Sequence, residues 1–170
     1  MKEITDRFSN IIAWWLPGAF LLWMLSYQLP TNALSDDKSI GGFLFASLAA
    51  LVLGVIVNAL RWTIFDRWVF RSLDTEKPSL EQYSLLKDDK TLAAFQALVD
   101  ANYRWYQAYA NTAVAAASGC LINVFTRKWP WWTIFFAVGL LVILVPAARN
   151  ELVAFYQRAK LILRKGDTIQ

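Results

Sequence analysis

Polar side chains recur along one face of an alanine-rich segment. Gln107, Asn111 and Ser118 lie at helical spacing between residues 106 and 125. Amide and hydroxyl groups at membrane depth are costly unless they meet partners or water, so this face is predicted to point inward. Two kinds of chemistry fit the pattern. The face lines a pore around a symmetry axis, or it joins helices by hydrogen bonds to Asn58 or to a backbone carbonyl.

A second group of side chains is charged and flanks the apolar segments. It comprises Arg61, Arg67, Asp100 and Arg104. Guanidinium groups bind phosphate in a forked geometry, so the group is a candidate vestibule that selects ions or holds an anionic ligand such as a nucleotide. In the alternative, Asp100 and Arg104 form an ordinary i,i+4 helix pair and the two arginines are solvated anchors at the membrane surface.

Enzyme chemistry has few candidates in this chain. It has no histidine, which removes the usual general base and the commonest metal ligand. Its one cysteine, Cys120, lies in an apolar segment, and no glycine-rich phosphate loop or metal-ligand spacing occurs. We therefore expect a non-enzymatic protein with no cofactor and no metal.

The segments that must position these residues are long and apolar. Hydrophobic residues make up 57% of the chain, against about 45–50% in soluble domains. Four candidate spans can be distinguished: Ile11–Leu29, Ile40–Leu60, Tyr106–Phe125 and Trp131–Val145. The second predicts a helix about 30 Å long, which matches the hydrocarbon thickness of a bilayer. The fold class predicted is therefore an all-α membrane protein with four transmembrane helices and short helical cytoplasmic extensions.

Two prolines mark expected irregularities in these spans. Pro17 precedes Gly18 within the first span and predicts a kink or break there, because proline removes one backbone hydrogen bond. The fourth span is expected to stop near Pro146.

Small residues recur at every fourth position of the second span, at Gly42, Ala46, Ala50 and Gly54. Such a ridge lets another helix approach closely in lipid, where association depends on packing. We expect the ridge to pack inside one subunit rather than between copies. Thr112, Ala116 and Gly119 are the predicted opposing surface.

The distribution of basic residues predicts the orientation. Fourteen of the seventeen Lys and Arg residues lie on the cytoplasmic side if both termini and residues 61–105 are placed there. The chain then divides into an interfacial helix with two spans (1–60), a cytoplasmic helical segment (61–105), two further spans (106–147) and a basic amphipathic tail (148–170). This arrangement explains the net charge of +4 without a nucleic-acid partner.

Local patterns predict helices in the cytoplasmic parts. Trp62, Phe65, Val69 and Leu73 continue a 3.6-residue apolar spacing beyond Arg61. Ser79 and Gln82 form a capping box that opens a short helix. In the tail, an apolar stripe is predicted to lie on the inner leaflet or against the other cytoplasmic helices; it consists of Leu152, Phe155, Tyr156, Ala159 and Leu163.

The aromatic-rich stretch from Asn102 to Asn111, which leads into a span, resembles the corresponding part of small multi-span bacterial membrane proteins from anti-phage defence operons. Leu16, Pro17 and Gly18 add to the likeness. The resemblance covers about ten residues and names no catalytic residue. It implies a membrane effector that disturbs the inner membrane when infection is sensed.

The sequence thus predicts an oligomeric effector or channel-like protein of the bacterial inner membrane, gated through its cytoplasmic helices. The alternative is a non-conducting membrane anchor that recruits a cytosolic partner protein. The expected partners are the lipid bilayer, further copies of the chain and a cytosolic protein, with no nucleic acid.

Overall fold

The computed structural model describes residues 2–26, 40–83, 86, 89–126 and 131–167, and every element in these ranges is a helix. The α-helices are α1 (Lys2–Ser26), α2 (Ile40–Arg61), α3 (Leu80–Tyr83), α4 (Asp89–Leu98), α5 (Arg104–Thr126) and α6 (Trp131–Asp167). Two segments are π-helical, η2 (Trp62–Val69) and η4 (Val99–Tyr103), and η3 (Arg71–Glu76) is a 3₁₀ helix. The predicted all-α class is confirmed for the described residues.

Within the part of the chain that the structure describes, three helical stretches are long and apolar enough to cross a membrane: Gly41–Val69, Asp89–Thr126 and Trp131–Arg164. α1 contributes a shorter apolar helix, Ala13–Ser26, and residues 27–29 of the predicted first span lie outside the described residues. By length and composition, this is a membrane-associated protein.

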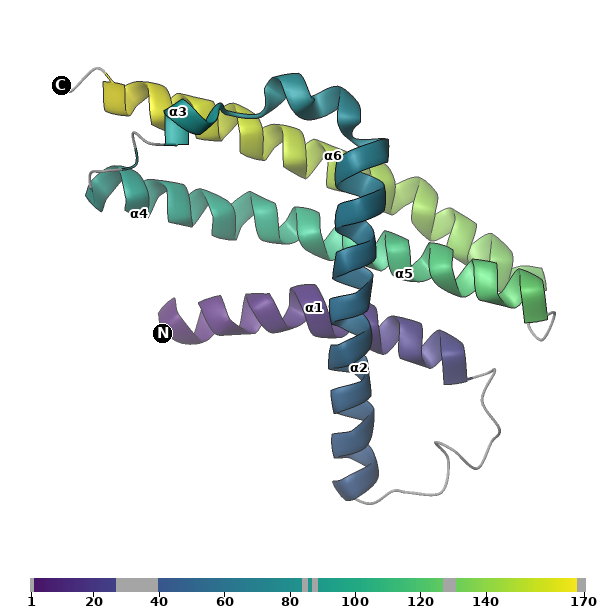
Figure 1. The fold of residues 1–170 in the computed structure, drawn as a ribbon. Helices are drawn as coiled ribbons and strands as arrows, with labels where there is room; N and C mark the ends of the chain where they lie inside the picture. The colour runs from purple at the N-terminus through teal and green to yellow at the C-terminus, as the bar shows by residue number, and fades with distance from the viewer. Residues whose placement is uncertain (1, 27–39, 84–85, 87–88, 127–130, 168–170) are drawn as a thin grey trace.

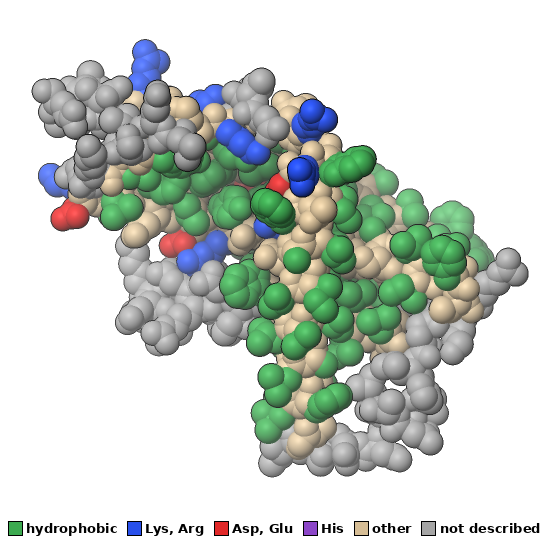
Figure 2. All heavy atoms as spheres, viewed as in Figure 1, with side chains coloured by type: hydrophobic (Ala, Val, Ile, Leu, Met, Phe, Trp, Pro, Cys, Tyr) green, Lys and Arg blue, Asp and Glu red, His purple; other side chains and the backbone are tan. Residues whose placement is uncertain are grey.

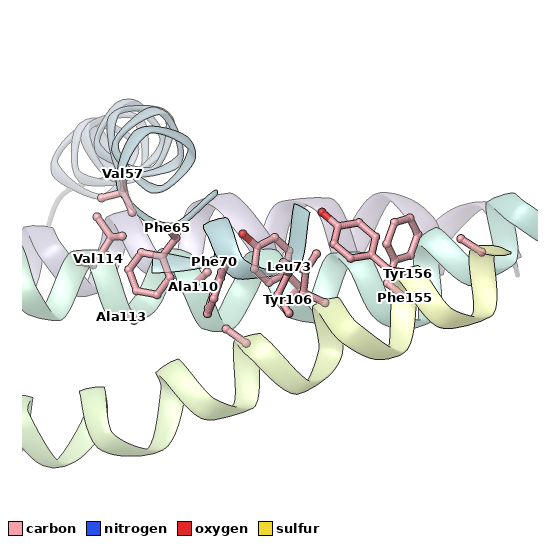
Figure 3. Close-up of a cluster of buried hydrophobic side chains, with 14 of the residues drawn as sticks. Val57, Phe65, Phe70, Leu73, Tyr106, Ala110, Ala113, Val114, Phe155 and Tyr156 are labelled. Carbon is pink, nitrogen blue, oxygen red and sulfur yellow. The ribbon is translucent and has the colours of Figure 1, made fainter. Parts of the chain in front are cut away.

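The helices do not form a parallel bundle. α5 lies between α1 and α6, whereas α2 runs across α1 and α5 and contacts both (Figure 1). Figure 3 shows the same relationship, with α2 seen almost end-on beside helices that are seen lengthwise. No single membrane normal is parallel to both directions, so α2 and the α5–α6 pair would have to be tilted if both crossed one bilayer. A tilted span needs more than about 20 residues. The helical stretch Gly41–Val69, which we call the apolar rod, has 29.

The chemistry of the exposed side chains differs between two parts of the surface. Apolar side chains cover the length of α2 and the neighbouring surface of the helices behind it, whereas the Lys and Arg side chains visible in this view lie at the upper end of α2 and on the side of α3 and α4 (Figure 2). The apolar surface of α2 is therefore suited to lipid. The part of the molecule that carries the visible Lys and Arg side chains, which we call the charged end, is suited to water.

The alanines of α5 explain its central position. Ala110, Ala113, Ala115 and Ala116 are fully buried. Because their side chains are single methyl groups, both α1 and α6 can approach α5 closely. Larger side chains complete the core toward the charged end, where Phe65, Phe70, Tyr106, Phe155 and Tyr156 meet (Figure 3).

Both prolines lie inside continuous helices. Pro17 is within α1, and Pro146 is within α6, which extends for 37 residues. Pro146 does not end the helix, which agrees with the helical extension predicted beyond the fourth span. Proline removes one hydrogen bond from a helix, but neighbouring helices support the backbone of a membrane segment at such a position. The apolar stripe of the tail therefore belongs to α6, where its residues are buried against α4, η4 and α5.

The capping box at the start of α3 is confirmed. The backbone N–H of Ser79 donates to Oε1 of Gln82 at 2.9 Å, and the N–H of Gln82 donates to Oγ of Ser79 at 3.3 Å.

The apolar register after Arg61 differs from the predicted one. Phe65 and Leu73 are buried as expected, but Trp62 and Val69 are exposed and Phe70 is buried instead. η2 is π-helical, and the N–H of Phe70 donates to the carbonyl of Phe65, five residues earlier, at 2.8 Å. The wider turn brings the rings of Phe65 and Phe70 onto one face, 5.4 Å apart.

Candidate functional site

The polar face of α5 meets α1 inside the chain. Asn111 is fully buried, and its Nδ2 donates to the backbone oxygen of Ala13 at 3.0 Å. In a regular helix this carbonyl accepts from the residue four positions later, which is Pro17 and has no N–H. Asn111 therefore supplies the donor that Pro17 cannot. The other amide atom, Oδ1, has no hydrogen-bond partner among the described residues.

The remaining predicted members of the polar face are not gathered around Asn111. Gln107 and Ser118 are half-buried on α5. Asn58, on α2, accepts a hydrogen bond from Nε of Arg61 at 3.3 Å instead of meeting α5.

The small residues of α2 pack on α1. A Cβ added at Gly54 would lie 2.0 Å from the backbone oxygen of Trp14, and one added at Gly18 would lie 1.8 Å from the backbone oxygen of Ala50. Ala50 and Gly54 are buried at this crossing, whereas Gly42 and Ala46, nearer the start of α2, are half-buried. The two backbones are thus in direct contact, which requires glycine on both helices.

The predicted opposing surface for this ridge was wrong. The ridge meets Trp14 and Gly18 of α1, while Gly119 of α5 faces the Met24 side chain of α1. Small residues occur on both helices, so the spacing alone did not identify the pairing.

A compact ionic cluster lies where α2 passes into η2. Arg61 is only 3% exposed, and its Nη1 donates to both carboxylate oxygens of Asp66, at 3.3 and 3.2 Å. The hydroxyl of Tyr106 donates to the same carboxylate. The guanidinium carbon of Arg61 also lies 5.2 Å from the centre of the Tyr106 ring. A buried charge is tolerated when it is paired and hydrogen-bonded, and Arg61 meets both conditions.

Beside this cluster lies a groove of about 790 Å³. It is lined by Trp62, Thr63, Asp66, Arg67, Trp68, Arg71 and Lys77. The three basic side chains are exposed, so the groove combines positive charge with two aromatic walls. We call it the basic groove, and it is the candidate functional site.

The other charged residues form separate contacts. Asp100 pairs with Arg104 at 2.6 Å, as the i,i+4 alternative predicted. Asn102 joins helices instead: its Nδ2 donates to Glu151 at 2.8 Å, and Nη1 of Arg158 donates to its Oδ1 at 2.9 Å. Of the four residues predicted for a vestibule, only Arg67 lines the basic groove, with Arg61 buried next to it.

Arg71, Lys77 and Tyr106 were not identified as site residues from the sequence. A usable signal was present, because Arg67 and Arg71 lie four residues apart at the end of an apolar span and alternate with Trp62 and Trp68. Tyr106 could not be found in this way, since its partner Asp66 is forty residues distant.

The fold and the groove define an all-helical membrane-associated protein with a basic site at the charged end of α2. Among the residues that the structure describes, no three His, Cys, Asp or Glu side chains are placed to hold a metal ion. Comparison with family models, curated proteins and solved structures finds no match to this chain.

Proposed function

We propose that the protein is a non-conducting anchor that holds a cytosolic partner protein at the bacterial inner membrane. The observation that supports this most directly is the hydrogen bond from Asn111 to Ala13, made by a fully buried side chain within one chain. A side chain that lines a conduit has to face water. Asn111 instead joins two helices of the same chain.

The charged end of the molecule supplies a surface for the partner. α4 and α6 pack there through Phe95 and Phe155, whose rings lie 6.0 Å apart, and Asn102 bridges Glu151 and Arg158. These contacts fix the second half of α6, which presents Gln157 and Leu161 on its exposed side. We place this end and both termini in the cytoplasm, because that orientation puts most basic residues inside. Residues 102–111 resemble a stretch of small membrane proteins from anti-phage defence operons, and we therefore propose anti-phage defence as the biological context.

A photo-crosslinking amino acid tests the proposal in living cells. At Gln157 or Leu161 it should give adducts with one cytosolic protein. At Phe135, which is exposed on the apolar half of α6, it should give none with that protein. Adducts at the two cytoplasmic positions that contain only copies of this chain, or no protein, would contradict the anchor.

The second candidate is the oligomeric, channel-like effector. It is favoured by Oδ1 of Asn111, a buried acceptor without a partner among the described residues, which would bind water if α1 moved away from α5. Conduction would then require separation of these helices and several chains around one axis.

A further inference from the structure

The basic groove has the charge of a phosphate site. Arg67, Arg71 and Lys77 line it, and among the described residues neither arginine takes part in an ion pair. Guanidinium groups suit phosphate because their forked donors match its oxygens.

The one carboxylate in the groove is already neutralised. Asp66 accepts hydrogen bonds from Arg61 and from the Tyr106 hydroxyl. The carboxylate therefore repels an incoming anion less than an unpaired one would. Arg61 and Tyr106 thus offset the charge of Asp66, and Arg67 and Arg71 supply exposed positive charge to the groove.

The position of the groove distinguishes a lipid from a soluble anion. It lies at the end of the apolar rod Gly41–Val69, and its walls include Trp62 and Trp68, which are 63% and 78% exposed. Exposed tryptophan at the end of a span settles at the level of the lipid headgroups. Apolar side chains are exposed along α2 next to the groove, among them Val52, Val55, Ile56 and Leu60. Acyl chains can lie along that surface while the phosphate enters the groove.

We propose that the basic groove binds the phosphate headgroup of an anionic phospholipid in the membrane that α2 crosses. This assignment depends on α2 crossing the bilayer, but it does not depend on the recruitment of a protein partner. Its failure and that of the anchor are therefore distinguishable.

Lipid retention tests the proposal. The full chain is purified in mixed micelles with equal amounts of phosphatidylglycerol and phosphatidylcholine, and the lipids that remain bound are counted by native mass spectrometry. The wild type should retain phosphatidylglycerol preferentially. Arg67→Gln with Arg71→Gln should lower that preference about tenfold or more, as expected for two basic groups at a membrane surface.

A matched control removes the same charge elsewhere. Lys90 and Arg149 are exposed and lie outside the groove, so Lys90→Gln with Arg149→Gln should leave the preference nearly unchanged. An equal loss of the phosphatidylglycerol preference in both double variants, or no such preference in the wild type, would contradict the proposed lipid site. Arg67→Gln alone, which should show a smaller loss in the same direction, replaces the double variant if that protein does not fold.

A competition experiment separates the two sources of phosphate. Glycerol 3-phosphate added at the concentration of the lipid should not displace phosphatidylglycerol, because it lacks the acyl chains that contact α2. Displacement at equal concentration would contradict a lipid site and indicate a soluble phosphate compound.

Discussion

Nδ2 of Asn111 lies 3.0 Å from the backbone oxygen of Ala13, the carbonyl that Pro17 leaves without its helical donor. A break in the hydrogen bonding of α1 is thus compensated by a side chain of α5, ninety-eight residues further along the chain. The contact joins two predictions that were separate in the sequence, a proline irregularity and a buried polar face.

Replacement of Asn111 by leucine should have a modest effect. Asn111→Leu loses one hydrogen bond inside the membrane, which costs about 0.6 kcal/mol on average and at most about 2 kcal/mol. It also removes the unpaired Oδ1, which offsets part of that cost. Thermal unfolding in detergent measures the change. The cost should be smaller in a Pro17→Ala background, where residue 17 has its own N–H for Ala13, and an equal cost in both backgrounds would exclude the proposed coupling.

The crossing of α1 and α2 should not tolerate a side chain at Gly54. Gly54→Leu places a Cβ against the Trp14 backbone, which cannot rotate away. The free energy of unfolding should therefore fall by about 3 kcal/mol or more, or the protein should fail to assemble. Gly139→Leu is the matched control, because nothing lies within 4 Å of a Cβ at that position. Wild-type thermal stability of the Gly54 variant would show that the backbones are not in contact.

The hydroxyl of Tyr106 should contribute measurably to stability. Tyr106→Phe keeps the ring in the core but removes a hydrogen bond to a charged carboxylate, which should cost about 1.5–3 kcal/mol. Tyr109→Phe should cost much less, because the Tyr109 hydroxyl makes no hydrogen bond within the described part of the chain and its ring packs beside Trp105. Equal losses in the two variants would argue against a special role for Tyr106.

Topology can be tested from outside the cell. A cysteine introduced at Asn32 in a Cys120→Ala background should react with an impermeant reagent in intact cells, and tags at Met1 and Gln170 should be protected. This outcome follows from the distribution of Lys and Arg. Protection of position 32 together with accessible tags would reverse the orientation, and the basic groove would then face the outside.

Much of the fold could be predicted because membrane helices leave strong local signals. The start of α2 at Ile40, its helical continuation past Arg61 and the capping box at Ser79 all follow from hydropathy or from residues three or four apart. The π-turns could not be predicted in this way. A π-turn changes the residues that share a face, and here Phe70 is buried in place of Val69.

The candidate site was harder to predict because its contacts are distant in sequence. The pairings of Tyr106 with Asp66 and of Asn102 with Glu151 depend on how separate helices pack. The direction of α2 across α1 and α5 is likewise set by the close contact of Gly18 with Ala50, and small-residue spacing does not specify which helix is the partner.

Ion flux through vesicles distinguishes the anchor from the channel most directly. The purified chain is reconstituted into phosphatidylglycerol-containing vesicles that enclose a fluorescent ion reporter, and leakage is recorded for the wild type and for Asn111→Leu. Because Asn111 is buried against Ala13, we expect both proteins to leave the vesicles as tight as protein-free ones. Wild-type leakage that Asn111→Leu abolishes while the protein remains folded would contradict the anchor and establish the polar face of α5 as a pore.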